Sequence, residues 1–174
     1  QSVGWDLKAR AGKKQVVLEL GGNAACVVDN DADLDDAVAR CVFGGYYQSG
    51  QSCIGVQRIL LHRDIYDDFR DRFVKSVGEL KHGDPSDDET FVGPIISPDE
   101  CDRIHNWVRE AADGGANVLT GGEKISDRVY RATVLEDVPK DAKANCDEVF
   151  GPVTLLRPFD TYDQALAMVN DSDY

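Results

Sequence analysis

The polar stretch Gln48-Ser49-Gly50-Gln51-Ser52-Cys53 separates two apolar patterns of different period. Before it, apolar residues recur at helical spacing between Leu34 and Tyr46. After it, residues 58–62 have the composition of a strand. A glycine-containing loop that ends on a cysteine therefore joins a helix to a strand. Because glycine lets the backbone approach a ligand closely, Cys53 is a candidate nucleophile.

A single carboxylate stands upstream in Leu18-Glu19-Leu20-Gly21-Gly22-Asn23. Residues 16–20 predict a buried strand, which the two glycines end. Glu19 is the only charged residue between Gln15 and Cys26. A carboxylate in apolar surroundings can take a proton from water, so Glu19 is a candidate general base.

The apolar runs of four to six residues are fuller than strict alternation would give. Strands buried on both faces have this composition, which predicts the α/β class with a mostly parallel sheet covered by helices. Helix starts are predicted at four capping residues, which are Asp33, Asp64, Ser97 (followed by Pro98) and Thr161.

Composition limits the classes of function. The chain has 174 residues, 42% of them hydrophobic, which suffices for one domain with a core. A formal net charge of −13 argues against binding to nucleic acid or to an anionic membrane. Five cysteines without a Cys-x-x-Cys pair fit a reducing compartment, and no run is long enough to span a bilayer. We expect a cytoplasmic protein.

Two patterns suggest a metal site, and neither is complete. Residues 29–33 alternate acids as a calcium loop does, but Leu34 replaces the required glycine and Arg40 stands where the bidentate glutamate belongs. Cys101 and His105 are four residues apart on a predicted helix, with no third ligand indicated. No metal site is expected.

Three motifs, taken together and in this order, resemble the aldehyde dehydrogenase superfamily. They are residues 18–23, Gly50-Gln51-Ser52-Cys53 and Glu148-Val149-Phe150-Gly151-Pro152, and residues 92–96 between them also match. The resemblance covers nearly the whole chain. It implies the catalytic domain of an aldehyde dehydrogenase-like fold, truncated at both ends. Residues 1–14 would be a linker or the tail of a cofactor-binding domain. Residues 15–174 would be the thiol-bearing catalytic domain, incomplete at its C-terminal end.

The resemblance also implies roles for particular residues. Cys53 matches the nucleophile and Glu19 the general base. Glu148 matches the residue that binds the nicotinamide-ribose hydroxyls, Phe150 packs near the ring, and the carbonyl of Leu20 faces the nicotinamide. The implied reaction is NAD- or NADP-dependent oxidation of an aldehyde to a carboxylic acid through a thiohemiacetal and a thioester on the cysteine.

The resemblance has consequences for the chain as a whole. The family's dinucleotide-binding domain would lie upstream, and no Gly-x-Gly-x-x-Gly occurs here. We therefore expect these 174 residues alone to be inactive, and the full-length protein to be a homo-oligomer.

Two other interpretations stay open at this point. In a cysteine hydrolase, His62, His82 or His105 would activate Cys53. In a non-catalytic assembly module, Cys53 would be inert. The remaining cysteines at positions 26, 41 and 146 are interpreted as small buried hydrophobic residues.

Overall fold

A five-stranded sheet forms the centre of the computed structural model, which describes residues 2–174. Its strand order is β1-β2-β5-β4-β3. The bounds are Ala25–Val28 (β1), Arg58–His62 (β2), Asn117–Thr120 (β3), Thr133–Glu136 (β4) and Val153–Phe159 (β5). The first four strands in this order run parallel, and β3 pairs antiparallel with β4. The predicted α/β class with a mostly parallel sheet is confirmed.

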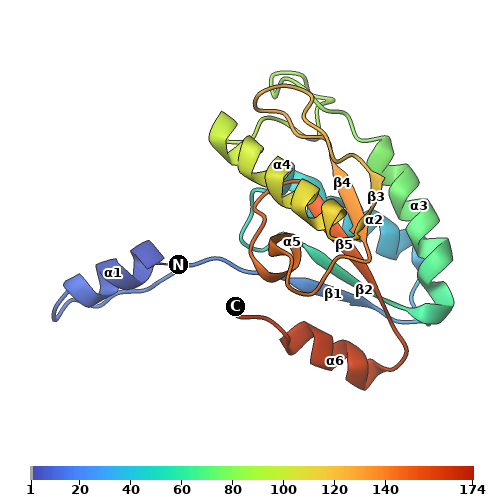
Figure 1. Ribbon diagram of the computed structural model, residues 1–174, viewed down its shortest axis with the longest axis horizontal. Coiled ribbons are helices and arrows are strands. Elements are labelled where there is room, and N and C mark those ends of the chain that lie inside the picture. The colour runs from blue at the N-terminus through green and yellow to red at the C-terminus, as the bar shows by residue number, and fades with distance from the viewer. Residues whose placement is uncertain (1) are drawn as a thin grey trace.

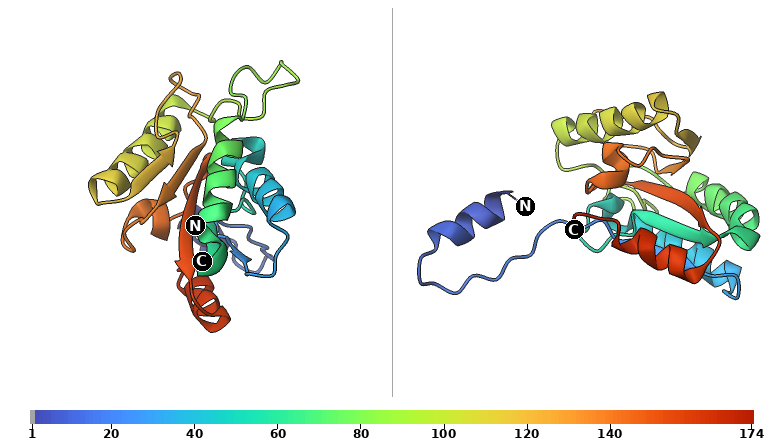
Figure 2. Two further views of the ribbon diagram at one scale, coloured as in Figure 1. Left: turned by 90° about the vertical axis from the view of Figure 1, so that its right-hand side faces the viewer. Right: turned by 60° about the horizontal axis from the view of Figure 1, so that its bottom comes forward.

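Helices cover both faces of the sheet (Figures 1 and 2). One face carries α2 (Leu34–Tyr46) and α3 (Tyr66–Gly78), and the other carries α4 (Pro98–Asp113), α5 (Lys143–Cys146) and α6 (Tyr162–Asn170). On β2, Ile59 and Leu61 join the core beneath α2 and α3, whereas Leu60 joins the core beneath α6. This burial on both faces explains why β2 is apolar at successive positions.

Three of the four predicted capping residues begin their helices. The prediction for Asp64 is wrong, because Asp64 lies inside a short 3-10 turn (Arg63–Ile65) before α3, which has no side-chain cap. The Asp33 carboxylate accepts the backbone N–H groups of Asp35 and Asp36 at 3.0 and 3.1 Å. The hydroxyls of Ser97 and Thr161 each accept the N–H of the third residue along, at 3.2 and 3.3 Å. Each cap satisfies donors that the first turn of a helix leaves without a partner.

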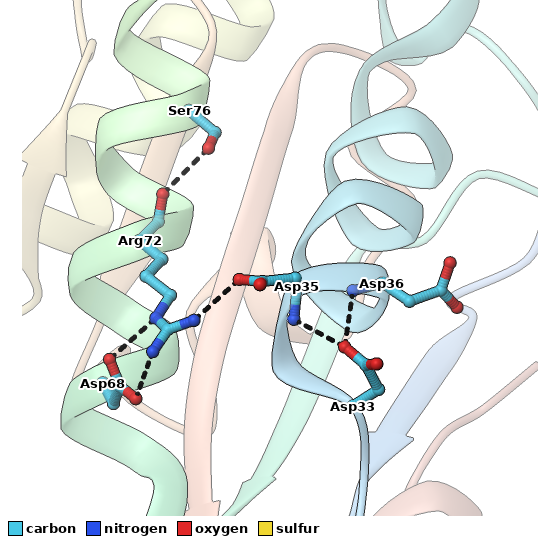
Figure 3. A network of polar contacts seen from close by, with 6 residues as sticks. All are labelled: Asp33, Asp35, Asp36, Asp68, Arg72 and Ser76. Atoms are coloured by element: carbon cyan, nitrogen blue, oxygen red, sulfur yellow. Dashed lines mark hydrogen bonds and ion pairs between the residues drawn. The ribbon is translucent and has the colours of Figure 1, made fainter.

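Arg72 connects the two helices of one face (Figure 3). Its guanidinium donates to Asp35 at the start of α2 at 2.7 Å and to both carboxylate oxygens of Asp68 at 2.8 Å. These groups are largely exposed, so solvent screens the pairs and they contribute little to stability. Their main effect is to fix the start of α2 against α3.

The N-terminal residues form an arm that projects from the sheet (Figure 1). Helix α1 (Ser2–Arg10) has no buried residue, and the chain returns to the body in extended form. At Gly4 a Cβ would lie 2.6 Å from the Leu20 side chain, so α1 packs on the returning segment. No helix among residues 2–174 is long and apolar enough to cross a membrane.

The predicted buried strand over residues 16–20 is wrong. The structure assigns no strand there, and Val17 is 89% exposed. A strand needs a neighbour to accept and donate its backbone hydrogen bonds. In the described chain no other strand lies beside these residues, so the apolar run stays extended without pairing.

Candidate active site

The Cys53 loop begins with an unusual backbone conformation. After α2, a short 3-10 turn spans Tyr47–Gly50, and within it Gln48, Ser49 and Gly50 have φ values of 51°, 59° and 68°. Side chains with a Cβ rarely occupy this left-handed region, which costs roughly 1 kcal/mol or more per residue. Surrounding contacts must therefore hold the loop in place, and they leave Cys53 exposed.

Ser49 supplies the first of these contacts. Its buried hydroxyl accepts the N–H of Gly93 at 2.8 Å and donates to the Gly93 carbonyl at 3.2 Å. One side chain thus satisfies both backbone groups of a residue 44 positions away. The strained turn is joined in this way to the segment 92–96.

Gln51 adds a second, two-ended contact with the same segment. Its amide nitrogen donates to the Pro94 carbonyl at 3.2 Å, and its amide oxygen accepts the N–H of Ile96 at 2.9 Å. Ser49 and Gln51, which we call the loop clamp, therefore fix the residues before Cys53 on a second part of the chain.

Gly50 brings the third motif against the loop. A Cβ at Gly50 would lie 2.1 Å from the carbonyl oxygen of Gly151, closer than any real contact. Only glycine allows the two backbones to touch here, as well as adopting the positive φ. This contact places the Cys53 loop directly beside residues 148–152.

Glu148 reaches the diglycine turn. Its Oε1 accepts the N–H of Gly22 at 3.0 Å, and its Oε2 would lie 2.5 Å from a Cβ at Gly21. A Cβ at Gly22 would in turn lie 3.1 Å from the carbonyl oxygen of Cys53. Gly22 thus lies between the Glu148 carboxylate and the backbone of Cys53.

Gln57 holds the segment around Glu148 through hydrogen bonds of its side-chain amide. This buried amide donates to the carbonyls of Ala144 and Asp147 at 3.0 and 2.8 Å and accepts the N–H of Val149 at 2.9 Å. Two of these bonds are to Asp147 and Val149, which flank Glu148, so the residue just before β2 sets the position of the carboxylate.

Arg58, the next residue, holds the peptide that follows Gly22. Its guanidinium donates to the Asn23 carbonyl at 2.9 Å and to the carbonyls of Met168 and Val169 in α6 at 2.8 and 3.2 Å. Burial, and then the charge of Arg157, lower the pKa of Arg58. The carbonyl acceptors compensate a cation that has been taken out of water.

A small cavity lies where these segments meet. Its volume is about 20 Å³, and its lining includes Gly22, Ser52, Glu148 and Phe150. Phe150 is 40% exposed and has a φ of 49°. The space is sufficient for about one water-sized group, with a carboxylate and an aromatic ring at its wall.

A larger cavity of about 420 Å³ lies elsewhere, between α5 and α6. Arg58, Arg157 and Met168 contribute to its lining, and none of the five predicted site residues does. The smaller cavity, in contrast, is lined by Glu148 and by Gly50 and Ser52 of the loop that leads to Cys53.

The five predicted site residues fall into two groups. Cys53, Glu148 and Phe150 lie on segments that touch through Gly22 and Gly50. Glu19 and Leu20 lie on the N-terminal arm, where Glu19 is exposed and Leu20 packs against Gly4. Within residues 2–174 no hydrogen bond joins Glu19 to Cys53.

The three histidines have partners away from Cys53. His62 accepts the N–H of Asp64, His82 accepts the N–H of Ala132, and His105 lies 3.4 Å from the hydroxyl of Tyr130. A cysteine hydrolase needs a histidine next to the sulfur, so the geometry does not support that interpretation.

One cysteine differs from its prediction. Cys146 is exposed instead of buried, because it ends the short helix α5 at the surface, where its thiol donates to the Lys140 carbonyl at 2.8 Å. Cys41 is buried as predicted, and Cys26 is half-buried.

Sequence reasoning overlooked the residues that position the site. Ser49, Gln51, Gln57 and Arg58 act through hydrogen bonds to distant backbone groups. Gln57 and Arg58 could have been found, because two long polar side chains stand together where an otherwise apolar strand begins. A buried polar side chain needs hydrogen-bond partners.

Comparison with known proteins places this site in a family. The sequence profile described as the aldehyde dehydrogenase family matches residues 1–174. The aldehyde-dehydrogenase-like protein y4uC of Sinorhizobium fredii is 44% identical over 99% of this chain and 34% of its own length. The chain belongs to the aldehyde dehydrogenase family.

Solved structures agree with this assignment. Aldehyde dehydrogenase 21 from Physcomitrella patens, in complex with the reaction product succinate, has a TM-score of 0.96 and 44% identity, and the match covers 99% of this chain and 36% of that one. Betaine aldehyde dehydrogenase from Staphylococcus aureus, in complex with NAD+, has a TM-score of 0.93 and 30% identity, with coverage of 99% and 36%. The chain thus spans about a third of the length of these relatives.

The family uses NAD(P), and the described residues fit one end of such a cofactor. Oε1 of Glu148 is bonded to Gly22, and Oε2 faces the bare Cα of Gly21, where a ring carbon of Tyr174 also comes within 3.3 Å of the position that a Cβ would take. A carboxylate accepts hydrogen bonds from ribose hydroxyls, and an exposed ring such as that of Phe150 can pack on a flat heterocycle. Glu148 and Phe150 would therefore hold the nicotinamide-ribose end.

Proposed function

We propose that the full-length protein carrying this chain oxidises an aldehyde to a carboxylic acid with NAD or NADP, using Cys53 as nucleophile and Glu19 as general base. The observation that carries the proposal is the convergence of the motif segments around an exposed thiol. Gly50 contacts Gly151, Gly22 contacts Cys53, and Glu148 bonds Gly22.

The first step is addition of the Cys53 sulfur to the aldehyde carbon. The carbonyl oxygen becomes an alkoxide, whose charge requires a preorganised donor. The backbone N–H of Cys53 is the nearest candidate, and the loop clamp of Ser49 and Gln51 keeps it in one position. A fixed donor stabilises the developing charge without reorganisation at the moment of reaction.

The chemistry that NAD(P) supplies when bound is acceptance of a hydride from the thiohemiacetal carbon, which leaves a thioester on Cys53. In this step Glu148, Phe150 and the carbonyl of Leu20 orient the nicotinamide-ribose end. The position of Glu148 is in turn set by Gly22 and Gln57.

Glu19 acts in the last step, hydrolysis of the thioester. Its carboxylate takes a proton from the attacking water, and the Cys53 sulfur leaves as the acid is released. Glu19 is exposed on the arm and is two residues before Gly21. The arm must therefore bring the carboxylate toward the sulfur for this step.

The test is replacement of Cys53 by Ser in the full-length protein, with NADH or NADPH formation measured over a panel of aldehydes. We expect a loss of at least about a thousandfold, because the covalent intermediate can no longer form efficiently. Cys146→Ser is the matched control, since Cys146 is also exposed but lies on α5, and it should retain activity. Retained turnover in Cys53→Ser would refute the assignment.

Alkylation of this chain distinguishes the inert assembly module. An activated Cys53 should react with iodoacetamide near neutral pH faster than Cys146, the other exposed cysteine. Equal rates at the two positions would favour an inert thiol.

We further propose a cytoplasmic homo-oligomer that binds neither nucleic acid nor membranes. The net charge of −13 and the absence of a Cys-x-x-Cys pair support this. Size-exclusion chromatography with light scattering measures the mass of the full-length protein in solution. A mass equal to that of a single protomer would contradict the oligomer proposal.

A further inference from the structure

Two cysteines that the proposed chemistry does not use lie in contact. Cys26 is on β1 and Cys41 is on α2, and their sulfur atoms are 3.9 Å apart. Both side chains belong to the core between the sheet and α2. Within residues 2–174 no other two cysteine sulfurs are in hydrogen-bonding contact. The pair is therefore a specific feature of this face of the sheet.

The two thiols are chemically unequal. The S–H of Cys41, donated to the sulfur of Cys26, lowers the pKa of Cys26 to about 7, although burial opposes this shift. The same hydrogen bond, followed by burial, raises the pKa of Cys41. Cys26 is half-buried and Cys41 is 3% exposed. The more accessible sulfur is thus the one that ionises, and the thiolate is the reactive form of cysteine.

We propose that Cys26 and Cys41 form an intrachain disulfide when the protein meets a peroxide. The Cys26 thiolate attacks one peroxide oxygen, the O–O bond breaks, and Cys26 becomes a sulfenic acid while hydroxide leaves and takes up a proton. The Cys41 sulfur then attacks the Cys26 sulfur, the S–O bond breaks, and water leaves. In total, two thiols lose two electrons and hydrogen peroxide is reduced to two molecules of water.

The contact between the two sulfur atoms favours the second step. A disulfide bond is about 2.0 Å long, so the sulfurs must approach by about 1.9 Å from their separation of 3.9 Å. Cys41 lies directly beside Cys26, so it intercepts the sulfenic acid before a second oxidant molecule is needed.

The bond would connect a helix to a strand next to the proposed active site. It closes the loop between residues 26 and 41, and α2 continues at its C-terminal end into the strained turn before Cys53. Oxidation would therefore fix the helix that leads into the nucleophile loop, independently of whether Cys53 itself is oxidised.

The experiment treats the unmodified chain with hydrogen peroxide, blocks free thiols with iodoacetamide after denaturation, and maps the peptides by mass spectrometry without reduction. We expect a linked pair of peptides carrying Cys26 and Cys41, released by dithiothreitol. The same linked pair should form in the double variant Cys53→Ser/Cys146→Ser, which lacks both exposed thiols. Cys101→Ser, at a cysteine buried elsewhere in the core, should also leave it unchanged.

Single variants test the order of events. Cys41→Ser should stop at a sulfenic acid on Cys26 that dimedone traps, and Cys26→Ser should leave Cys41 reduced at the same dose. The proposal is overturned if both cysteines remain alkylatable at a peroxide dose that oxidises Cys53 completely. It is equally overturned if Cys26 links to a cysteine other than Cys41. Circular dichroism of each variant, matching the parent chain, ensures that the folded state is being compared.

Discussion

The backbone N–H of Gly22 donates a hydrogen bond of 3.0 Å to the carboxylate of Glu148, although 126 residues separate them along the chain. This bond joins the first motif of the sequence to the last. It exists because Gly21 has no Cβ to displace the carboxylate and because Gln57 holds the peptides on both sides of Glu148.

The first prediction concerns this contact. In the full-length protein, Gly21→Ala should raise the KM for NAD(P) by about tenfold, equivalent to ~1.4 kcal/mol, since the new Cβ would lie 2.5 Å from Glu148 Oε2. Steady-state kinetics with varied cofactor measure this. Gly78→Ala, at the end of α3 with only a contact of 3.9 Å, is the control and should not change KM. An unchanged KM in Gly21→Ala would contradict the role given to Glu148.

The second prediction separates the proposed base from the nucleophile. Glu19→Gln should reduce steady-state turnover by about 10²–10⁴-fold, the usual contribution of a general base. The first turnover should persist, because thioester formation does not need Glu19. Stopped-flow absorbance should therefore show a burst of about one NADH or NADPH per Cys53, followed by slow release. Glu79→Gln, at another exposed glutamate, should behave as wild type, and loss of the burst in Glu19→Gln would show that the carboxylate acts earlier.

The third prediction concerns stability of the Cys53 loop. Gly50→Ala should reduce the free energy of unfolding by about 3 kcal/mol or more, because a positive φ and a backbone clash at 2.1 Å coincide. Gly115→Ala is a matched control, since it has a φ of +110° but no atom within 4 Å. It should lose only about 1 kcal/mol. Urea unfolding measures both, and equal losses would mean that the contact with Gly151 carries no energy.

The fourth prediction is a pH dependence that arises at His82. Its Nε2 accepts the N–H of Ala132 at 2.8 Å, which requires the neutral ring. Burial, and then the charge of Arg131, lower the pKa of His82 in the folded chain below its ordinary value of about 6.5. Protonation therefore favours the unfolded chain. The stabilisation is complete above pH ~6.5 and decreases as the pH falls from there through the lower folded-state pKa.

Urea midpoints between pH 7 and 5 would test this dependence. The loss on acidification should be smaller in His82→Gln than in wild type. His105→Gln, in which the replaced ring meets a tyrosine hydroxyl, should keep the wild-type loss. If His82→Gln and wild type lose stability in parallel, His82 is not the titrating group.

The sheet and its helices followed from local patterns. Residues 59–61 are apolar at successive positions because both faces are covered, and Asp33, Ser97 and Thr161 bond only to neighbours in sequence. Features of this kind depend on short-range chemistry, which a sequence displays directly.

The predictions failed where the outcome depends on a distant partner. Residues 16–20 have the composition of a strand, yet whether they form one depends on a neighbouring strand, and none is present in the described part of the chain. Cys146 was predicted to be buried. Helix α5 has only 4 residues, too few for a repeating apolar pattern to indicate which side of the helix faces solvent. The loop clamp was invisible because Ser49 and Gln51 meet partners more than 40 residues away.

The guanidinium of Arg58 has a consequence beyond its own neighbourhood. It bonds at once to the peptide after the diglycine turn and to the last turn of α6. One cation beside a central strand thus couples Asn23, just before β1, to the C-terminal helix. Unfolding α6 would remove two of the acceptors that hold this guanidinium in place, so a change near residue 170 would weaken the support of the turn to which Glu148 is bonded.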